Sequence, residues 1–525
     1  MSGEPLLRIE KLSISFDKSA PRQVVSNVSF TLNAGQLVAI VGESGSGKSV
    51  TCRSILGLAG EKAHLSSEVF ELQGQSVHNF SEQDWRKIRG KSVGLVLQDA
   101  MTSLDPLRVI GDEVREVLDI HQTGDRKSRI SRVIESLTAA GFSQARQRAG
   151  QRPRMLSGGL RQRALIAAAT AGKPSILIAD EPTTALDATL QKKILGLLKT
   201  LATQGNGVLL VTHDLPLVAA VADYILVMKD GEIVERGTPQ EIFHSTNHPY
   251  AKSLLAAVPS RQTTARHFTV KQTHTPPAIV ASELSKSYRS LQSKTAAPVI
   301  SDISFVLPQG KTLGLIGESG AGKSTVARLL TGMEQPDSGF VNLFGTAWSA
   351  VSESQRRSQR WLIQMVYQDP LSSFDPRMNA GEIITDALKA AGVRDKGEKL
   401  RRAHQLLAQV ELPESVFTQS PVNLSGGQRQ RLAIARALAT SPKILICDEP
   451  VSALDAITQA KILALLMKLQ SEFGLSIVFI SHDLAVISQI CDHIVVLHQG
   501  QIVEYDTADN VINRPQHQYT KELLS

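Results

Sequence analysis

Two stretches of the chain match the eight-residue pattern GxxxxGK[ST]: Gly42 to Ser49 (GESGSGKS) and Gly317 to Ser324 (GESGAGKS). Their surroundings repeat as well, in four pairs that lie 268 to 270 positions apart: Gln98 and Gln368, Ser157 and Ser425, Asp180 and Asp448, His213 and His482. A repeat on this scale means that a whole folding unit occurs twice with few insertions or deletions. Each half must therefore build its own core around one copy of the glycine-rich pattern.

Length and composition fit two ordinary globular halves. At 525 residues the chain exceeds what one core supports, and 42% hydrophobic with 20% charged residues lets each half bury its own core. The N-terminal residues lack a signal-peptide pattern, and no apolar run approaches the ~18 residues that span a bilayer. We therefore expect neither a cleaved leader nor a membrane span.

Cysteine and charge content exclude several other classes. Cys52, Cys447 and Cys491 form no CxxC pair, which predicts a reducing compartment without a disulfide framework or a zinc site. The net charge of +7 is compatible with nucleic acid or an anionic membrane surface. Basic clusters such as Arg146 to Arg154 are explained more simply as solvated helix faces. Nucleic acid is therefore not a predicted partner.

Each half opens in the same way. Alternating segments at residues 6–16 and 280–288 indicate antiparallel strands. The apolar runs 37–41 and 313–316 then lead directly into the glycine-rich stretch and a helix-compatible segment. Strand, glycine loop and helix is the context that a phosphate-binding loop requires.

The rest of each half completes an α/β pattern. Polar segments with helical periodicity, at about residues 100–155 and 370–422, predict an inserted helical lobe. Unbroken apolar runs, typical of parallel strands covered on both faces, follow it: residues 176–179, 208–211, 444–447 and 477–480. The predicted fold class is α/β, with two tandem domains that each combine a parallel-sheet core, an antiparallel β subdomain and the helical lobe.

A segment rich in Thr, Gln, His, Arg and Pro, from Pro259 to Pro277, shows no periodicity and indicates a linker. The predicted domains are residues 1–262 and 279–525, with the linker at 263–278.

The repeated loop predicts nucleotide binding, because a polyphosphate needs donors that leave its terminal phosphorus open to attack. Glycines let successive backbone N–H groups and a helix start face the phosphates. Lys48 adds a point charge for the β and γ groups, and the Ser49 hydroxyl can ligate Mg²⁺. Two copies in register make a chance match very improbable. The predicted loop residues are Gly42, Glu43, Ser44, Gly45, Ser46, Gly47, Lys48 and Ser49, and Gly317, Glu318, Ser319, Gly320, Ala321, Gly322, Lys323 and Ser324.

An acidic pair ends an apolar strand in each half. Asp180 and Asp448 stand where ligands bind in open α/β sheets, which fits a carboxylate that supports the metal. The adjacent Glu181 and Glu449 can polarise the water that attacks the γ-phosphate. The alternative is a helix-capping acid before a proline, but capping would not coincide with two phosphate loops in register.

Leu156 to Leu160 (LSGGL) and Leu424 to Gln428 (LSGGQ) resemble the signature sequence of ATP-binding-cassette (ABC) ATPases, and the resemblance covers nearly the whole chain. Ser-Gly-Gly before a helical stretch makes a second anion-binding helix terminus, for which one site has no use. In this family two cassettes with RecA-like cores pack head to tail, and each signature covers the nucleotide held by the other cassette. The resemblance therefore implies an intramolecular dimer with two shared ATP sites.

The first implied site combines Lys48, Ser49, Gln98, Asp180, Glu181 and His213 with Ser425, Gly426, Gly427 and Gln428. The second combines Lys323, Ser324, Gln368, Asp448, Glu449 and His482 with Ser157, Gly158 and Gly159. The family assigns the glutamine to Mg²⁺, the attacking water and the link to the transporter, and the histidine to the γ-phosphate. The implied catalytic residues are therefore the two glutamates, glutamines and histidines. The implied Mg²⁺ ligands are Ser49, Gln98, Asp180, Ser324, Gln368 and Asp448.

Further positions follow the family pattern less closely. Asp187 and Asp455 resemble the loop that connects the two sites across the dimer. Phe16 and Tyr288 occupy the place of the aromatic residue that stacks on the base. For Phe16 the alternative is a core residue, as aromatic residues in an early strand more often are. Leu160 replaces the usual glutamine in the site that uses Lys323, and we expect a tolerated change rather than a dead site.

The segments QDAMTSLDP (98–106) and QDPLSSFDP (368–376) resemble the peptide and nickel importer subfamily. Asn247 to Leu255 (NHPYAKSLL) is similar to its C-terminal extension, of which the second copy is expected to keep only Tyr519 and Leu523-Leu524. Some relatives carry an iron–sulfur cluster in this extension. The three cysteines lie elsewhere, so no cluster is predicted.

The fusion of two cassettes without a membrane domain resembles the ATP-binding subunit of Yej-type importers of peptides and microcin C. A fused glutathione importer subunit is the alternative. A ribosome factor would place a long charged arm between the halves, and a DNA-repair relative would carry cysteine pairs for zinc. The resemblance implies ATP and Mg²⁺ as cofactors. It also implies two integral-membrane permeases and a periplasmic solute-binding protein as partners, and the cytoplasmic face of a bacterial inner membrane as the location.

Overall fold

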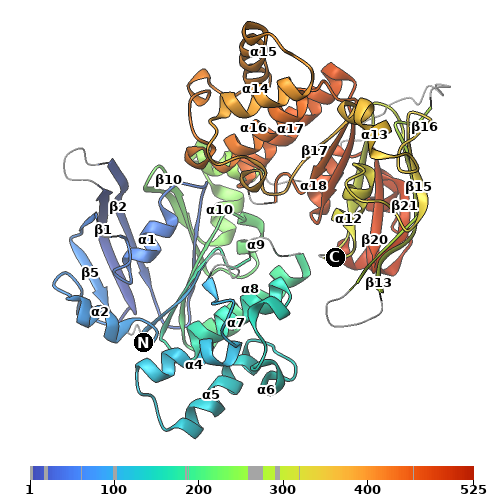
Figure 1. Ribbon diagram of the computed structural model, residues 1–525. Helices are drawn as coiled ribbons and strands as arrows, with labels where there is room; N and C mark the ends of the chain where they lie inside the picture. The colour runs from blue at the N-terminus through green and yellow to red at the C-terminus, as the bar shows by residue number, and fades with distance from the viewer. Residues whose placement is uncertain are drawn as a thin grey trace. The chain divides into compact units, whose positions relative to one another are not determined.

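The computed structural model describes residues 4–16, 22–60, 62–97, 103–183, 186, 188–257, 276–289, 296–318, 320–452 and 454–524. The chain forms two compact units, of which the first comprises residues up to 258 and the second almost all residues from 259 onward. Each unit holds a mainly parallel sheet, a separate antiparallel sheet and a group of helices (Figure 1). This repeated architecture confirms the predicted fold class. Most of the predicted linker, residues 263–275, lies outside the described residues.

The first unit contains a six-stranded sheet of order β11-β10-β3-β9-β8-β7, in which only β11 runs antiparallel to its neighbour. Its strands are β3 (Leu37–Val41), β7 (Val93–Val96), β8 (Ile176–Asp180), β9 (Gly207–Thr212), β10 (Tyr224–Lys229) and β11 (Glu232–Gly237). The antiparallel sheet holds β1 (Leu7–Phe16), β2 (Arg22–Leu32), β4 (Ala63–Ser66), β5 (Val69–Leu72) and β6 (Gln75–Ser76). The helices are α1 (Lys48–Ser54), α2 (Glu82–Ile88), α4 (Ile110–Ile120), α5 (Arg126–Ala139), α6 (Ala145–Arg148), α7 (Gly158–Thr170), α8 (Ala188–Thr203), α9 (Leu215–Ala219), α10 (Pro239–Ser245) and α11 (Pro249–Ala257).

The second unit repeats this plan with the sheet order β17-β18-β19-β14-β20-β21. Its strands are β14 (Thr312–Ile316), β17 (Ile363–Val366), β18 (Ile444–Asp448), β19 (Ser476–Ser481), β20 (His493–His498) and β21 (Gln501–Thr507). The antiparallel sheet holds β12 (Ile279–Arg289), β13 (Ala296–Leu307), β15 (Ser338–Leu343) and β16 (Thr346–Ala347). The helices are α12 (Lys323–Leu330), α13 (Glu353–Arg356), α14 (Ala380–Ala390), α15 (Lys396–Gln409), α16 (Gly426–Leu438), α17 (Ala456–Phe473), α18 (Leu484–Ile490), α19 (Ala508–Asn513) and α20 (Gln518–Leu524).

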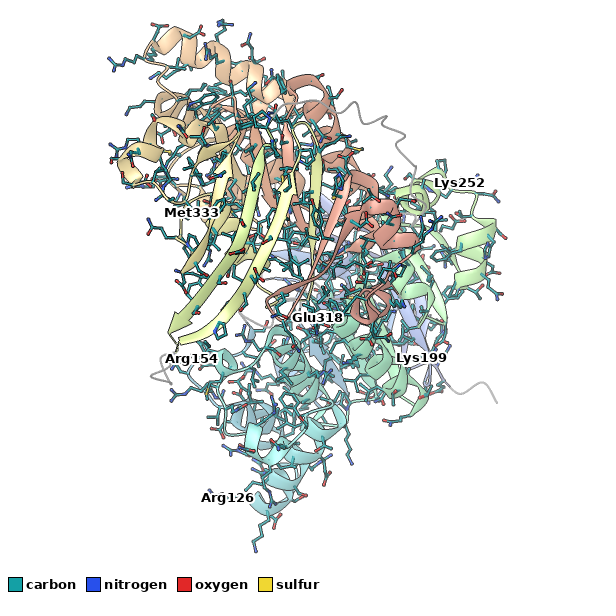
Figure 2. All side chains as sticks on the ribbon, turned by 90° about the vertical axis from the view of Figure 1, so that its right-hand side faces the viewer. Arg126, Arg154, Lys199, Lys252, Glu318 and Met333 are labelled. Atoms are coloured by element: carbon teal, nitrogen blue, oxygen red, sulfur yellow. The ribbon has the colours of Figure 1, made fainter. Side chains whose placement is uncertain are left out.

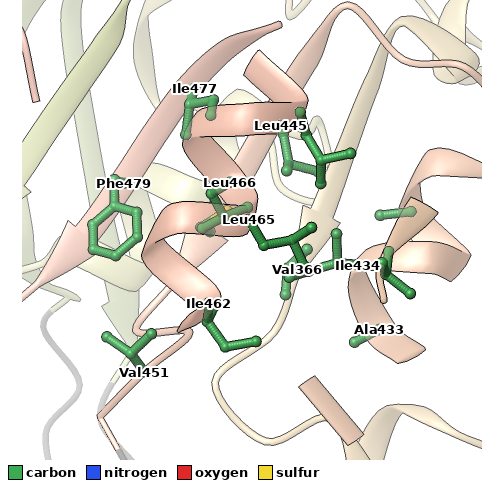
Figure 3. Close-up of a cluster of buried hydrophobic side chains, with 14 of the residues drawn as sticks. Val366, Ala433, Ile434, Leu445, Val451, Ile462, Leu465, Leu466, Ile477 and Phe479 are labelled. Atoms are coloured by element: carbon green, nitrogen blue, oxygen red, sulfur yellow. The ribbon is translucent and has the colours of Figure 1, made fainter. Parts of the chain in front are cut away.

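The interior strands read as unbroken apolar runs because both of their faces are covered. All five residues of β3 and of β14 are buried, and so are all five of β8 and of β18. On one face of the second sheet, Leu445 and Ile477 belong to the same buried cluster as Leu465 and Leu466 of α17 (Figure 3). This packing fixes where each strand ends, and the functional side chains follow those ends.

The sequence predicted these elements closely. The predicted run 37–41 matches β3, and the predicted strand at 280–288 lies within β12. The helical lobe is confirmed by α4 to α6 in the first unit and by α14 and α15 in the second. Arg126, the first residue of α5, lies at the outer end of this lobe (Figure 2). Across the described ranges, no helix is long and apolar enough to cross a bilayer.

Candidate ATP-binding and hydrolysis site

A glycine-rich loop joins the carboxyl end of an interior strand to a helix in each unit, from β3 to α1 and from β14 to α12. Gly47 and Gly322 precede these helices with φ angles of 101° and 102°, a region that residues with a side chain rarely adopt. A Cβ atom at Gly42 would lie 2.1 Å from the backbone oxygen of Met228, so a side chain has no room there. The two constraints produce a tight loop of the kind that binds anions.

A lysine ammonium group is held inside each loop. Lys48 is 4% exposed, and its Nζ donates to Gly42 O at 2.8 Å and to Glu43 O at 2.7 Å. Burial lowers the pKa of Lys48, and the negative charge of Glu181 opposes this shift. The second unit repeats the hydrogen bonds with equivalent atoms: Lys323 Nζ to Gly317 O at 2.7 Å and to Glu318 O at 3.0 Å. A buried cation in an anion-binding loop suits a polyphosphate ligand.

A serine hydroxyl and an aspartate meet beside each loop. Ser49 Oγ donates to Asp180 Oδ1 at 2.9 Å, whereas the buried Asp180 Oδ2 has no hydrogen-bond partner among the described residues. Burial raises the pKa of Asp180 and of Asp448, while hydrogen bonds from Ser49 and Ser324 act in the opposite direction. A hydroxyl beside a carboxylate with an unused oxygen fits Mg²⁺, which takes few protein ligands and completes its shell with phosphate oxygens and water. When bound there, Mg²⁺ would neutralise charge on the phosphates.

A glutamate follows this aspartate and faces a histidine. The distance from His213 Nδ1 to Glu181 Oε2 is 3.5 Å, and that from His482 Nδ1 to Glu449 Oε2 is 3.4 Å. Both glutamates have a φ of 47°, a strained backbone for a residue with a side chain. Each backbone N–H is nevertheless held by the neighbouring strand: Glu181 N donates to Val211 O at 2.9 Å, and Glu449 N donates to Ile480 O at 3.0 Å.

In the second unit three groups surround the Glu449 carboxylate. Gln368 Nε2 donates to Glu449 Oε2 at 2.9 Å, and Lys323 Nζ lies 3.9 Å from Glu449 Oε1. Burial alone would raise the pKa of Glu449, but His482 and Lys323 outweigh it and hold this pKa below its ordinary value. A carboxylate that stays ionised and lies next to the phosphate-binding lysine is well placed to accept a proton from an attacking water.

The same glutamate–histidine pairs shift the pKa of the histidines in the opposite direction, upward. Burial disfavours the charged imidazolium, but the hydrogen bond and negative charge of Glu181 raise the pKa of His213 above its ordinary value. Glu449 raises the pKa of His482 in the same way. Each unit therefore couples one glutamate to one histidine near its phosphate loop.

The two signatures begin the helices that follow the lobe in sequence, α7 and α16, but their caps differ. Ser425 precedes α16 in a capping box, in which Gln428 N donates to Ser425 Oγ at 3.3 Å and Ser425 N donates to Gln428 Oε1 at 2.9 Å. Ser157 precedes α7 without a side-chain capping hydrogen bond, and Leu160 has no side-chain oxygen to accept the reciprocal bond from the Ser157 backbone N–H. Gly158, Gly159, Gly426 and Gly427 form the first turns of these helices. The sharing of signatures between cassettes stays a prediction.

Several predicted residues remain to be placed. Gln98, Asp187 and Ser319 lie outside the described residues. Tyr288 is 36% exposed, and its hydroxyl donates to Glu334. Phe16 is partly buried against the core of the first unit, as an early strand residue often is. Its role in stacking on the base stays a prediction, as does that of Tyr288.

A contact between the C-terminal extension and the loop was not predicted from the sequence. The backbone N–H of Glu43 donates to Tyr250 Oη at 2.9 Å, and that of Glu318 donates to Tyr519 Oη at 3.0 Å. The expectation that the second extension keeps only Tyr519 and two leucines is wrong, because His517 and Glu504 repeat contacts made by His248 and Glu235. The available signal was the spacing: all three pairs lie 269 positions apart, as the histidines of the site do.

A buried lysine in a polyphosphate loop, near a glutamate that can accept a proton, is the arrangement of a nucleotide hydrolase, and this chain contains it twice. The chain belongs to the ABC transporter family, whose model matches residues 25–184 and 300–452. A second model, the oligopeptide/dipeptide transporter C-terminal region, matches residues 234–288 and 503–525. The protein is thus an ATP-binding ATPase of the oligopeptide/dipeptide importer type.

Known relatives match it over nearly their full length. Glutathione import ATP-binding protein GsiA of Escherichia coli O157:H7 is 38% identical over 99% of this chain and 89% of that protein. The proteins of the same name from Escherichia coli strain K12 and Pectobacterium atrosepticum are 37% and 38% identical with the same coverage. A solved dimeric ATP-binding cassette with bound ADP and phosphate is 29% identical over 44% of this chain and 98% of that chain, with a TM-score of 0.41.

We predict that Glu181→Gln and Glu449→Gln each slow ATP hydrolysis at one site, and that the double variant loses ~10²–10⁴-fold in rate, because the amide cannot accept the proton from water. Steady-state phosphate release measures the rate, and the ATP Kd should stay within about twofold. The matched control is Glu68→Gln, which alters an exposed ion pair with Lys11. Unequal losses in the single variants would show that the two sites are not equivalent. A double variant with the wild-type rate would contradict the assignment of the base.

We predict that the same substitutions shift the histidine titrations. In wild type, His213 and His482 should titrate above the ordinary value of ~6.5, because their glutamates stabilise the imidazolium. In Glu181→Gln, burial becomes the dominant influence over the weaker opposing charge of Asp214, so the pKa of His213 should fall below that value while the pKa of His482 stays raised; Glu449→Gln should do the reverse. NMR of the histidine-labelled chain without nucleotide and metal measures both. Unchanged titration curves would contradict the coupling.

Proposed function

We propose that this chain is the subunit that hydrolyses ATP to drive an importer of small peptides or peptide-like solutes. The observation that carries the proposal is the extension: the C-terminal region of oligopeptide/dipeptide transporters matches the end of both cassettes. Relatives that align over 99% of the chain are named for glutathione import, and glutathione is itself a tripeptide. These relatives favour the glutathione alternative over the Yej-type importer of microcin C, which stays a narrower prediction.

ATP would act in this proposal by closing the two cassettes on each other. Each phosphate loop would hold one ATP with Mg²⁺, and the signature of the other cassette would cover it. Glu181 and Glu449 would activate water, while Gln98 and Gln368 would report the occupied site to the helical lobe. Closure would move the lobes, and hydrolysis would reopen the chain. Two permeases at the cytoplasmic face of a bacterial inner membrane, with a periplasmic solute-binding protein, would complete the importer.

A cleft of the second unit supports the link to a membrane partner. It has a volume of about 1320 Å³ and lies between core and lobe, where Tyr367, Ser372 and Phe374, on either side of Gln368 in sequence, line it. Ile383 and Ala387 of α14 form its lobe side, and Trp361, which is 44% exposed, lies on its core side. A cleft with an exposed aromatic residue suits insertion of a segment from a partner protein. We assign it to a permease.

The test is solute uptake in the source organism after deletion of the gene. We predict that deletion abolishes uptake of labelled glutathione or of short peptides, that the wild-type gene restores it, and that the Glu181→Gln, Glu449→Gln double variant does not. Proteins that co-purify with the chain from detergent-solubilised membranes should include two permeases, identified by mass spectrometry. Uptake that survives deletion for every peptide tested, or recovery of ribosomes or DNA in place of permeases, would contradict the proposal.

A further inference from the structure

The first peptide group of each phosphate loop is held at both of its polar ends. The peptide between Gly42 and Glu43 offers its oxygen to Lys48 Nζ at 2.8 Å and its N–H to Tyr250 Oη at 2.9 Å. The second unit has the same arrangement around the peptide between Gly317 and Glu318, with Lys323 Nζ at 2.7 Å and Tyr519 Oη at 3.0 Å. Because N–H and C=O of one peptide group share a plane, the tyrosine hydroxyl sets the direction in which the carbonyl meets the ammonium group.

The tyrosines themselves are firmly placed. Tyr250 is 6% exposed and Tyr519 is 7% exposed, and each has a basic side chain against its ring. Lys229 Nζ lies 5.1 Å from the centroid of the Tyr250 ring, and the His498 ring lies 4.0 Å from that of Tyr519, centroid to centroid. Burial raises the pKa of Tyr250 to about 12, so its phenol stays neutral in cells. A buried neutral hydroxyl is a fixed acceptor rather than a mobile surface group.

A second set of contacts ties the start of the extension helix to the strand before it. Glu235 Oε1 accepts a hydrogen bond from Asn247 N at 3.3 Å. The backbone N–H of Tyr250 donates to His248 Nδ1 at 3.2 Å. In the second unit, Glu504 accepts from Gln516 N at 2.9 Å and from His517 N at 3.2 Å, and Tyr519 N donates to His517 Nδ1 at 3.2 Å. The repeat thus preserves both the tyrosine and the hydrogen bonds that hold the residues next to it.

We propose that Tyr250 and Tyr519 are positioning residues for ATP binding, by which the C-terminal extension of each cassette orients the first peptide of the phosphate loop and, through its carbonyl, the phosphate-binding lysine. Neither tyrosine is required to touch the nucleotide. Polarisation of the shared peptide group by two hydrogen bonds strengthens both of them. The extension therefore contributes directly to ATP affinity, in addition to any contact with partners.

The test compares Tyr250→Phe and Tyr519→Phe, singly and together, in the full chain. Each change removes one hydroxyl and keeps the ring against its basic neighbour. Loss of one neutral hydrogen bond should raise the ATP Kd of the affected site and the KM for ATP by about threefold to tenfold, with kcat at saturating ATP within about twofold. The matched control is Tyr505→Phe, which removes a 2.9 Å hydrogen bond from a tyrosine hydroxyl to Val306 O, away from the loop.

Wild-type Kd and KM in both single variants, or an equal rise in the Tyr505→Phe control, would overturn the proposal. A merely structural role would instead lower the melting temperature and the active fraction while leaving KM unchanged. If the double variant does not fold, each single variant still leaves the other site as an internal reference. The assay uses the chain and ATP alone, so its outcome does not depend on the transported solute or on the permeases.

Discussion

In each unit, the rest of the site must stabilise the charge of one buried lysine. Lys48 and Lys323 are almost fully buried, and their nearest partners are carbonyl oxygens of their own loops. An ammonium group in such a place is stable only if the loop is tight enough to surround it and if anions lie within reach. The glycines provide the first condition, and strand-end acids such as Glu449 provide the second. Both conditions place the site at the carboxyl ends of buried strands, where a rigid sheet fixes the loop.

Elements with a strong local pattern could be predicted from the sequence almost residue by residue. β3 was predicted with its observed bounds, because five apolar residues that feed a glycine loop permit few other structures. The loop lysines, the aspartates and the glutamates were predicted as one site in each half, because the repeat kept their spacing. The contact of Gln368 with Glu449 could also have been predicted, because both residues follow neighbouring strands, β17 and β18.

What sequence analysis missed depends on tertiary packing between distant segments. Tyr250 is 207 positions from Glu43, and no periodicity or motif indicates that its hydroxyl meets the loop backbone. Phe16 and Tyr288 looked equivalent by position, but Phe16 packs against a core while the Tyr288 hydroxyl bonds to Glu334. The effect of Leu160 also became clear only in the structure. Leu160 lacks the side-chain oxygen with which Gln428 completes the capping box of α16, yet α7 persists because seven of its residues are buried. This favours a tolerated change over a dead site.

The central claim is that the phosphate loop of each half binds one ATP, anchored by the lysine of that loop. The most direct measurement is the number of ATP molecules bound per chain, determined by equilibrium dialysis for wild type, Lys48→Ala, Lys323→Ala and the double variant. The account predicts two in wild type, one in each single variant and none in the double variant. A single ATP in wild type, or undiminished binding in the double variant, would contradict it.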